Sequence, residues 1–425
     1  MGTETVMHAL LMPLGSAGDV HPYIGIGRRL RARGHHVTLI TSGYFEPHAR
    51  QAGLDFVALG TAQEYQEIMQ DPELWHPHKA FRKFAEVIAP RLMPPIYQAI
   101  MDRHVPGQTV MAASGNIFAA RAAHEKTGIP LATVHLQPAS FRSIYEPPMI
   151  CGLPLLRRIP KACCRAVFML VDLLVVDRLL LKMTNDFRAQ IGLRPIPRFV
   201  STWWNSPQRV IGLFPEWFAK PQPDWPSQTR LTGFPLYDAE DAEPMPADAE
   251  AFLQAGDPPL VFTPGSPIRG VDWFFQASAE ACRLLGRRGL LLTQYPEQIP
   301  ANLPDGVRHY PYLPFGRLLP RCAAIVHHGG IGTMAQALAA GIPQLLMPSC
   351  NDQPDNAMRL TALGGADQIS PDAYQAPRVA HRLKRLLESR EVLATSRTLA
   401  DRICSEDPLG KTCSLIEALL TNCQR

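Results

Sequence analysis

Two stretches of this sequence alternate short apolar segments with helix-like segments, and this alternation constrains the fold more than any other feature. In the first stretch the predicted strands are residues 7–13, 36–41, 55–59, 109–112 and 131–135, and the predicted helices are 22–33, 44–52 and 117–127. Parallel strands are connected by helices through right-handed crossovers. We therefore expect a parallel sheet covered by helices in the first half of the chain.

The same alternation restarts after residues 219–258, a stretch rich in proline and acidic residues. Here the predicted strands are 260–263, 289–293, 323–327 and 343–348, and the predicted helices are 271–286 and 332–340. A proline-rich polar stretch is typical of an interdomain linker. We expect an α/β protein in which two Rossmann-like domains, 1–218 and 259–408, face each other across a cleft and are joined by the linker 219–258.

The composition excludes several classes of protein. Of the 425 residues, 46% are hydrophobic and 19% are charged, which is typical of a folded chain rather than a disordered one. The net charge of +4 is too small and too scattered for a nucleic-acid surface. The nine cysteines contain no Cys-x-x-Cys pair, and the first residues lack the pattern of a secretory signal. We therefore expect reduced thiols in a cytoplasmic protein.

The most apolar stretch, residues 158–181, is interrupted by charged side chains and is too polar for a membrane span. It predicts a long amphipathic helix. Its apolar face is expected to pack on its own domain. The alternative is contact with a lipid acceptor or peripheral contact with the inner face of the plasma membrane.

The strongest chemical signal is the segment His327–Gln336, of sequence HHGGIGTMAQ, which lies between a predicted strand and a predicted helix. Glycines at such a turn let backbone N–H groups approach an anion, and the positive end of the helix dipole favours it. The segment matches neither a Walker A loop nor the GxGxxG dinucleotide fingerprint. It predicts a phosphate site at which a histidine donates a hydrogen bond to a diphosphate. The alternative is a purely structural turn.

Asp352 and Gln353 follow the next predicted strand, at the same edge of the sheet. A carboxylate beside a carboxamide supplies several acceptors and two donors, which suits the hydroxyl groups of a sugar. The alternative is a turn rich in Asp and Asn residues.

Together these segments resemble the nucleotide-sugar signature of the inverting GT-B glycosyltransferases, the superfamily of UDP-glycosyltransferases, sterol glucosyltransferases and antibiotic glycosyltransferases. The resemblance also covers Gly15–Pro22, Thr232–Leu236, Thr263–Ser266 and Tyr312–Pro320. Segments 71–75, 206–208, 213–218 and 224–226 look like the bacterial rhamnosyltransferases of rhamnolipid synthesis. The resemblance implies the GT-B fold, with a terminal helix in residues 409–425 that crosses back to the first domain.

For the donor, the resemblance implies roles for residues of the second half. The diphosphate would contact Gly265, Ser266, His328, Gly330, Gly332 and Thr333, the base and ribose would contact Tyr312, Leu313 and Gln336, and the transferred sugar would contact Asp352 and Gln353. Gln336 stands where relatives carry a ribose-binding glutamate, and Tyr312 stands where they often carry a tryptophan that stacks on the base.

For catalysis, the resemblance places Asp19 at the position of the catalytic base, with His21 as a second candidate. A carboxylate can take the proton of the acceptor hydroxyl while that oxygen attacks the anomeric carbon and inverts it. The alternative role of Asp19, which is compatible with the first, is to cap the helix that is predicted to begin near Pro22. The chain lacks the Asp-x-Asp pair of metal-dependent GT-A enzymes, so we expect no metal requirement and no cofactor.

An apolar acceptor is expected to bind the first domain. The candidate wall residues are Trp75, Phe81, Phe118 and Tyr145, with Phe84, Phe141 and the helix face of Phe168 and Leu173 as further candidates. The expected partners are a nucleotide sugar and a hydrophobic small molecule or lipid, and no nucleic acid is expected.

The implied function is transfer of a sugar from a nucleoside-diphosphate sugar to a lipophilic hydroxyl, with dTDP-L-rhamnose and a 3-(3-hydroxyalkanoyloxy)alkanoate as one substrate pair. A UDP-glucose-dependent enzyme acting on sterols, terpenoids or polyphenols is the first alternative. A binding protein without catalysis and a sugar-nucleotide epimerase are the others. The donor base and the sugar stay open.

Overall fold

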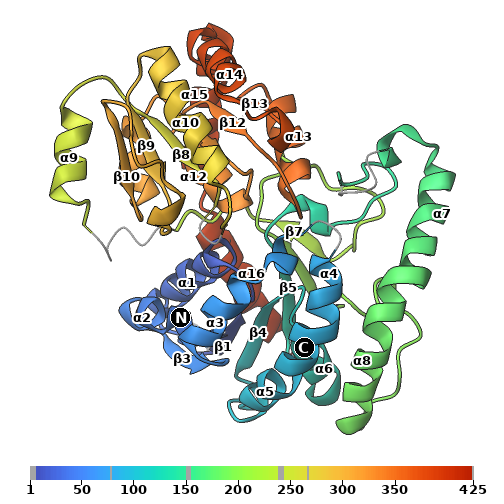
Figure 1. The fold of residues 1–425 in the computed structure, drawn as a ribbon. Coiled ribbons are helices and arrows are strands. Elements are labelled where there is room, and N and C mark those ends of the chain that lie inside the picture. Colours follow the sequence, from blue (N-terminus) through green and yellow to red (C-terminus); the bar gives the residue numbers. More distant parts are fainter. Residues whose placement is uncertain (1–5, 77–78, 150–154, 238–243, 266–267, 424–425) are drawn as a thin grey trace. The chain divides into compact units, whose positions relative to one another are not determined.

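The computed structural model describes residues 6–76, 79–149, 155–237, 244–265 and 268–423, and the chain divides into two compact units. Unit 1 is Met1–Pro148, Gly152–Tyr237 and Asp407–Arg425, and unit 2 is Met149–Cys151 and Asp238–Glu406. Each unit contains a parallel sheet with helices packed against it (Figure 1). The prediction of an α/β chain with two Rossmann-like sheets is confirmed. The division at residues 237 and 238 lies inside the segment 219–258.

The described part of unit 1 has a seven-stranded sheet in the order β3-β2-β1-β4-β5-β6-β7, with every neighbouring pair parallel. The strands are β1 (His8–Met12), β2 (His36–Thr41), β3 (Asp55–Ala58), β4 (Thr109–Ser114), β5 (Leu131–His135), β6 (Arg209–Gly212) and β7 (Thr229–Leu231). β4 is buried along its whole length, which explains its continuous apolar sequence. The strand order reverses between β1 and β4, and ligands of such sheets bind at the carboxyl ends of the strands at this point.

The helices of unit 1 pack against the sheet or against one another. They are α1 (Ala17–Ala32), η1 (Gly43–Phe45), α2 (Glu46–Gln51), α3 (Ala62–Met69), η2 (Pro72–Trp75), α4 (Ala80–Lys83), η3 (Phe84–Ile88), α5 (Ala89–Met101), α6 (Phe118–Thr127), η4 (Pro138–Ser140), η5 (Leu156–Arg158), α7 (Lys161–Val171), η6 (Asp172–Val176), α8 (Asp177–Gln190) and α16 (Pro408–Cys423). Buried side chains of α5, α6 and α8 form one core cluster with Leu10, Ile40 and Met111 of the strands.

The described part of unit 2 has a six-stranded parallel sheet in the order β10-β9-β8-β11-β12-β13. The strands are β8 (Leu260–Thr263), β9 (Gly289–Leu292), β10 (Val307–Tyr310), β11 (Ala324–His327), β12 (Gln344–Leu346) and β13 (Ala366–Gln368). The helices are α9 (Ala247–Gln254), α10 (Asp272–Leu285), η7 (Pro296–Gln298), α11 (Phe315–Leu318), η8 (Leu319–Arg321), α12 (Ile331–Ala339), α13 (Gln353–Ala362), η9 (Pro371–Ala373), α14 (Ala376–Glu388) and α15 (Arg390–Cys404).

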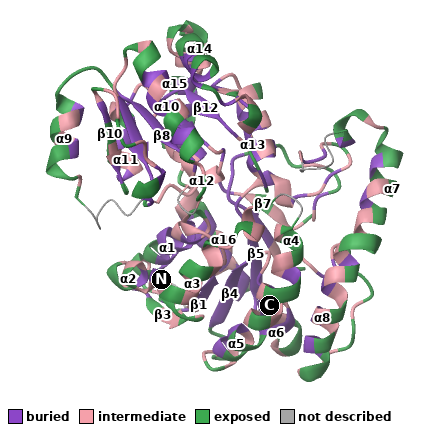
Figure 2. Cartoon of the chain, in the orientation of Figure 1, coloured by how far each residue is buried: buried purple, intermediate pink, exposed green. Residues whose placement is uncertain are grey.

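Both faces of the unit 2 sheet are covered, as the strand sequences require. Leu260 and Phe262 of β8 pack in a cluster with α10 and α14. Val261, which lies between them, packs in a second cluster with α9 and α11. Alternate residues of one strand therefore enter two separate cores, and Figure 2 shows the central strands of both sheets largely buried.

Helix α1 begins at Ala17 and not near Pro22, which corrects the predicted start. Oδ2 of Asp19 accepts hydrogen bonds from the backbone N–H of Ser16 at 2.7 Å and from its hydroxyl at 3.0 Å. This capping box starts the helix earlier, so Pro22 lies inside the helix. The rule that proline marks a helix start placed the boundary too late here.

Residues 161–181 of the predicted amphipathic helix 158–181 belong to a longer helical segment, in which α7, the π-helical turn η6 and α8 run without a break from Lys161 to Gln190. The helix therefore begins three residues later than predicted and continues past residue 181. Phe168, Leu180 and Phe187 lie on its buried side. No helix in the described ranges combines the length and the apolar composition that crossing a bilayer requires.

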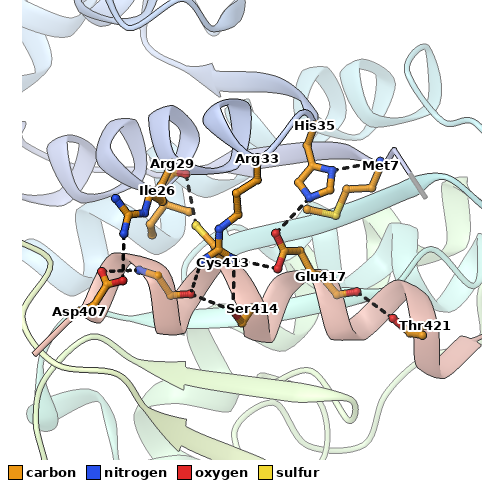
Figure 3. Close-up of polar contacts among 11 residues, drawn as sticks. Met7, Ile26, Arg29, Arg33, His35, Asp407, Cys413, Ser414, Glu417 and Thr421 are labelled. Carbon is orange, nitrogen blue, oxygen red and sulfur yellow. Dashed lines mark hydrogen bonds and ion pairs between the residues drawn. The ribbon is translucent and has the colours of Figure 1, made fainter. Parts of the chain in front are cut away.

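The terminal helix α16 packs on α1 within unit 1 through a set of polar contacts (Figure 3). Arg33, directly after α1, donates hydrogen bonds to Oε2 of Glu417 at 2.8 Å, to the hydroxyl of Ser414 at 3.1 Å and to the carbonyl oxygen of Gly410 at 3.1 Å. Nε2 of His35 lies 3.0 Å from the other oxygen of Glu417. One arginine therefore fixes about two turns of α16.

Arg33→Ala should lower the free energy of unfolding by about 1–2 kcal/mol, because it removes three hydrogen bonds and leaves Glu417 with a single basic neighbour. Urea unfolding followed by circular dichroism measures this. Arg31→Ala is the matched control, since Arg31 is exposed at the end of the same helix and its side chain makes no hydrogen bond to a described residue. Equal stability of the two variants would contradict the anchoring role of Arg33.

Candidate functional site

In unit 2 the loop after β8 and the turn after β11 meet around the ring of His328. β8 and β11 are neighbouring parallel strands, so both lead to the same edge of the sheet. A Cβ atom at Gly330 would lie 2.4 Å from Nε2 of His328, and a Cβ atom at Gly265 would lie 3.1 Å from Cε1. Gly265 also has a φ of +110°, which favours glycine. A side chain at residue 330 would therefore displace the imidazole, and one at residue 265 would crowd it and strain the backbone.

His327 holds the same turn from inside the sheet. It is fully buried, and its Nδ1 accepts a hydrogen bond from the backbone N–H of Gly329 at 3.1 Å. The proton must therefore be on Nε2, which donates to Oε1 of Gln344 at 2.9 Å. Nε2 of Gln344 donates in turn to the carbonyl oxygen of Met334 at 3.4 Å. One tautomer of His327 thus connects β11, β12 and α12.

Asn356 completes the support of this turn. Its Nδ2 donates to the carbonyl oxygen of Gly329 at 3.0 Å and to Oδ2 of Asp352 at 2.6 Å. Gly329 has a φ of +88°, and side chains bind both its N–H and its carbonyl oxygen. The backbone beside His328 is therefore held in one conformation.

His328 differs from His327 in that Nδ1 is buried without a hydrogen-bond partner among the described residues. Burial lowers the pKa of His328 to about 4. Burial and the neighbouring His328 lower the pKa of His327 to about 3. Both imidazoles are neutral at pH 7, so His328 offers one N–H donor and one acceptor to a ligand.

Three further residues predicted to bind a diphosphate, Gly330, Gly332 and Thr333, lie at the start of α12. Gly330 is the N-cap of this helix, Gly332 and Thr333 are in its first turn, and Gln336 is in the next turn. The backbone N–H groups of a first turn have no acceptor inside the helix and can bind an anion. Ser266 lies outside the described residues.

Asp352 and Gln353 lie where α13 begins, after a loop in which Asn351 has a φ of +53°. Oε1 of Gln353 accepts hydrogen bonds from the backbone N–H of Ser349 at 2.9 Å, from its hydroxyl at 3.0 Å and from the backbone N–H of Cys350 at 3.3 Å. The side-chain oxygen of Gln353 is therefore occupied by its own loop. Its Nε2, 3.6 Å from the sulfur of Cys350, is the donor that a sugar could use.

Tyr312 and Leu313 lie between β10 and α11 and point to different environments. Tyr312 is 43% exposed, as a side chain that stacks on a ligand requires. Leu313 is buried in the cluster with Leu290 and Leu318, so only its backbone is available for contact with a base.

In unit 1, Asp19 lies beyond the carboxyl end of β1, beside the point where the strand order reverses. Oδ2 is used by the capping box with Ser16, whereas Oδ1 makes no hydrogen bond to a described residue. Burial raises the pKa of Asp19, and the two hydrogen bonds from Ser16 act in the opposite direction. The capping box therefore uses one carboxylate oxygen of Asp19 and leaves Oδ1 able to accept a hydrogen bond from another molecule.

His21, the second predicted catalytic residue, lies two residues further along α1 in an aromatic cluster. The centre of its ring is 5.7 Å from that of His48, 6.1 Å from that of Tyr237 and 6.4 Å from that of Phe45. These residues come from α1, η1, α2 and the end of unit 1.

The four predicted acceptor residues lie in different environments. Phe118 is a core residue, with its ring centre 4.8 Å from that of Phe199, and the structure gives it a packing role. Trp75 is partly buried and donates to the carbonyl oxygen of Met69 at 2.9 Å. Phe81 is 40% exposed, and Tyr145 is 45% exposed with the ammonium group of Lys161 4.1 Å from its ring centre.

The comparisons with known proteins agree with this architecture. Residues 9–146 match the glycosyltransferase family 28 N-terminal domain, and residues 292–415 match the erythromycin biosynthesis protein CIII-like C-terminal domain. The solved glycosyltransferase of kitacinnamycin superposes with a TM-score of 0.74 at 20% identity, over 98% of this chain and 99% of its own. A spinosyn rhamnosyltransferase complexed with thymidine diphosphate gives 0.66 at 17% identity, over 96% and 100%.

Relatives also match at the level of sequence. The chain is 29% identical to the O-mycaminosyltylonolide 6-deoxyallosyltransferase of Streptomyces fradiae over 97% of both chains. It is 28% identical to a sterol 3-beta-glucosyltransferase of Arabidopsis thaliana over 94% of this chain and 64% of that one. The chain is a GT-B glycosyltransferase.

Sequence reasoning missed the residues that support the site of this glycosyltransferase. Gln344 and Asn356 bind the turn after β11 from a neighbouring strand and from α13. A buried amide side chain in a predicted strand was the available signal for Gln344, because a polar group at such a position needs a partner. In the described part of the chain, no three His, Cys, Asp or Glu side chains are grouped so as to hold a metal ion.

The stability of the glycosyltransferase should fall as the pH drops from about 6.5 toward 4. In this range the unfolded chain protonates residues 327 and 328, and the folded chain does not, because its pKa values lie at about 3 and about 4. A proton bound only on unfolding gives a slope of about 1.4 kcal/mol per pH unit. His327→Gln should reduce the measured slope of unfolding free energy against pH by up to that amount. An unchanged slope in both His327→Gln and His328→Gln would count against neutral buried imidazoles.

Proposed function

We propose that the protein transfers a sugar, with inversion and without a required metal, from a nucleoside-diphosphate sugar to the hydroxyl of a lipophilic small molecule or lipid. The observation that carries this proposal is the neutral ring of His328, held between two glycines just before α12 with a buried nitrogen that bonds no described residue. A departing diphosphate gains negative charge, which an N–H donor and a helix N-terminus stabilise.

Each donor group is assigned to part of unit 2. His328 donates to the diphosphate, and the backbone N–H groups of the first turn of α12 bind its oxygens together with the loop at Gly265. Tyr312 stacks on the base, while the Leu313 backbone and Gln336 contact the base edge and ribose. Asp352 and Nε2 of Gln353 bind the hydroxyl groups of the transferred sugar.

Asp19 of unit 1 is the proposed general base, with His21 as the second candidate. Oδ2 stays bound to Ser16, and Oδ1 accepts the proton of the acceptor hydroxyl. The acceptor oxygen forms a bond to the anomeric carbon as the bond to the diphosphate oxygen breaks, and the bonding electron pair leaves with the diphosphate. Because burial raises the pKa of Asp19, this carboxylate is a stronger base than an exposed one.

The favoured substrate pair is dTDP-L-rhamnose and a 3-(3-hydroxyalkanoyloxy)alkanoate, by the resemblance of segments 71–75, 206–208, 213–218 and 224–226 to the rhamnolipid enzymes. The solved rhamnosyltransferase with thymidine diphosphate supports a thymidine donor. The second candidate pair is UDP-glucose and a sterol-like alcohol, which the plant sterol glucosyltransferase supports.

Thermal unfolding with matched concentrations of UDP, dTDP, UDP-glucose and dTDP-rhamnose should show stabilisation by one nucleotide class. A ligand at about 100 times its dissociation constant adds about 2.7 kcal/mol. Gly330→Ala should abolish most of this shift, because its Cβ would displace the His328 ring. The matched control is Gly256→Ala, whose Cβ would meet only the tip of Arg288 at 3.3 Å. No shift with any nucleotide, or an equal shift in Gly330→Ala, would overturn the donor site.

Asp19→Asn should lower kcat by about 10²- to 10⁴-fold while donor binding stays unchanged. The carboxamide oxygen can still accept the Ser16 N–H, so α1 stays capped in this variant. The assay follows release of the nucleoside diphosphate in the presence of EDTA. If Asp19 served only as a cap, the folded variant would keep the wild-type kcat, and that result would rule out the base.

A further inference from the structure

The helical segment that runs from α7 to α8 carries an unusual exposed apolar patch. Met169, Leu170, Leu173, Leu174 and Val175, here called the α7 patch, are 66%, 55%, 50%, 53% and 43% exposed. They account for five of the fourteen exposed large hydrophobic side chains among the described residues, within seven consecutive positions. Figure 2 shows α7 exposed along most of its length. A contiguous apolar surface of this kind marks an interaction site.

The α7 patch is distinct from the side of the helix that packs on the protein, because other residues of the same helical segment form that packing. Cys164 and Phe168 pack in a cluster with Leu156. On α8, Leu180 and Phe187 enter the main core of unit 1. The helix is therefore apolar on two sides, and only one of them is buried by the protein itself.

The charges around the α7 patch are mostly positive on the outer side. Lys161 and Arg165 precede the patch and Arg178 and Lys182 follow it, and all four are exposed. Lys182 pairs with Asp186 at 2.6 Å, while Arg165 and Arg178 form no ion pair with a described residue.

The acidic residues of the same segment form ion pairs with basic side chains. Asp172 pairs with Arg142 at 2.5 Å, and Asp177 is buried and pairs with Arg198 at 2.8 Å. The outer surface is therefore an apolar centre with Arg165 on one side and Arg178 on the other, neither in an ion pair with a described residue, and with Lys161 and Lys182 further along the helix.

This charge arrangement disfavours a second copy of the protein as the partner. The midpoint between Arg165 and Arg178 lies between residues 171 and 172, and so does the midpoint between Lys161 and Lys182. In a two-fold dimer with these helices antiparallel, each cation would face the matching cation of the partner subunit. Like charges that face each other in this way are destabilising.

We propose that the α7 patch docks on a lipid bilayer that contains anionic headgroups. The helix lies in the plane of the interface, with the five apolar side chains below the headgroups and the four cations among the phosphate groups. Apolar burial and attraction to anionic lipid act together, so binding requires both and weakens as salt screens the charges. This proposal does not depend on the assigned sugar transfer, because neither donor nor acceptor takes part in it.

Sedimentation with sucrose-loaded vesicles tests the proposal, with one set made of phosphatidylcholine alone and one of phosphatidylcholine and phosphatidylglycerol. The wild-type protein should bind the anionic vesicles at least tenfold more strongly, and the double variant Leu170→Gln with Leu174→Gln should lose at least tenfold in partition coefficient. Leu284→Gln is the matched control, since Leu284 is 47% exposed on α10 of unit 2. Arg165→Gln with Arg178→Gln should abolish the preference for anionic lipid, and thermal unfolding checks that each variant is folded.

Failure of the wild-type protein to bind the anionic vesicles would overturn the proposal. So would equal binding by the wild-type protein and the Leu170→Gln, Leu174→Gln variant. A third experiment, sedimentation equilibrium without lipid, measures the oligomeric state of the wild-type protein and of the same variant. A wild-type dimer that this variant converts to a monomer would assign the patch to a second copy of the protein. None of these results would bear on donor binding or on Asp19.

Discussion

The site in unit 2 depends on one steric fact, which is that the ring of His328 occupies the space where residues 265 and 330 would carry side chains. Glycine at residue 330 leaves the space that the ring fills, and glycine at residue 265 lets the second loop adopt a positive φ and approach the ring without crowding it. The loop after β8 and the turn after β11 are thereby brought against one imidazole, just before the N-terminus of α12. The close approach that makes the turn glycine-rich is also what places a hydrogen-bond donor next to a helix N-terminus.

The two adjacent histidines differ in their hydrogen bonds and not in their charge. Both are neutral at pH 7, because burial lowers their pKa values to about 3 and about 4. His327 uses both ring nitrogens inside the protein, so its role is to hold the turn. His328 keeps a buried nitrogen without a partner among the described residues, which costs free energy unless a ligand supplies one. A diphosphate at this position would supply the partner, and its negative charge would raise the pKa of His328 and strengthen the hydrogen bond.

The sequence predicted the repeated α/β order and the position of the glycine turn, because apolar strands and glycines have local signatures. It did not predict β6 and β7, which are short and follow long irregular segments, nor the early start of α1, which depends on a capping box that the Pro22 signal obscured. Phe118 shows a second limit, because the sequence alone does not distinguish an aromatic residue of the core from one that lines a binding site. Gln344 and Asn356 show a third, because their partners become visible only when β12 and α13 lie next to the turn.

Asp19 shows how one residue can carry a structural and a proposed chemical role without conflict. The hydrogen bonds from Ser16 all reach Oδ2, so they stabilise the carboxylate form and oppose the effect of burial on its pKa. The two hydrogen bonds thus favour the carboxylate form of Asp19, while Oδ1 remains able to accept a proton. Because the capping box lies wholly in unit 1 and the His328 turn lies wholly in unit 2, each is built by its own sheet and its own helix N-terminus. The proposed base can therefore be tested by a substitution in unit 1 and the proposed donor site by a substitution in unit 2, each without a change to the hydrogen bonds of the other.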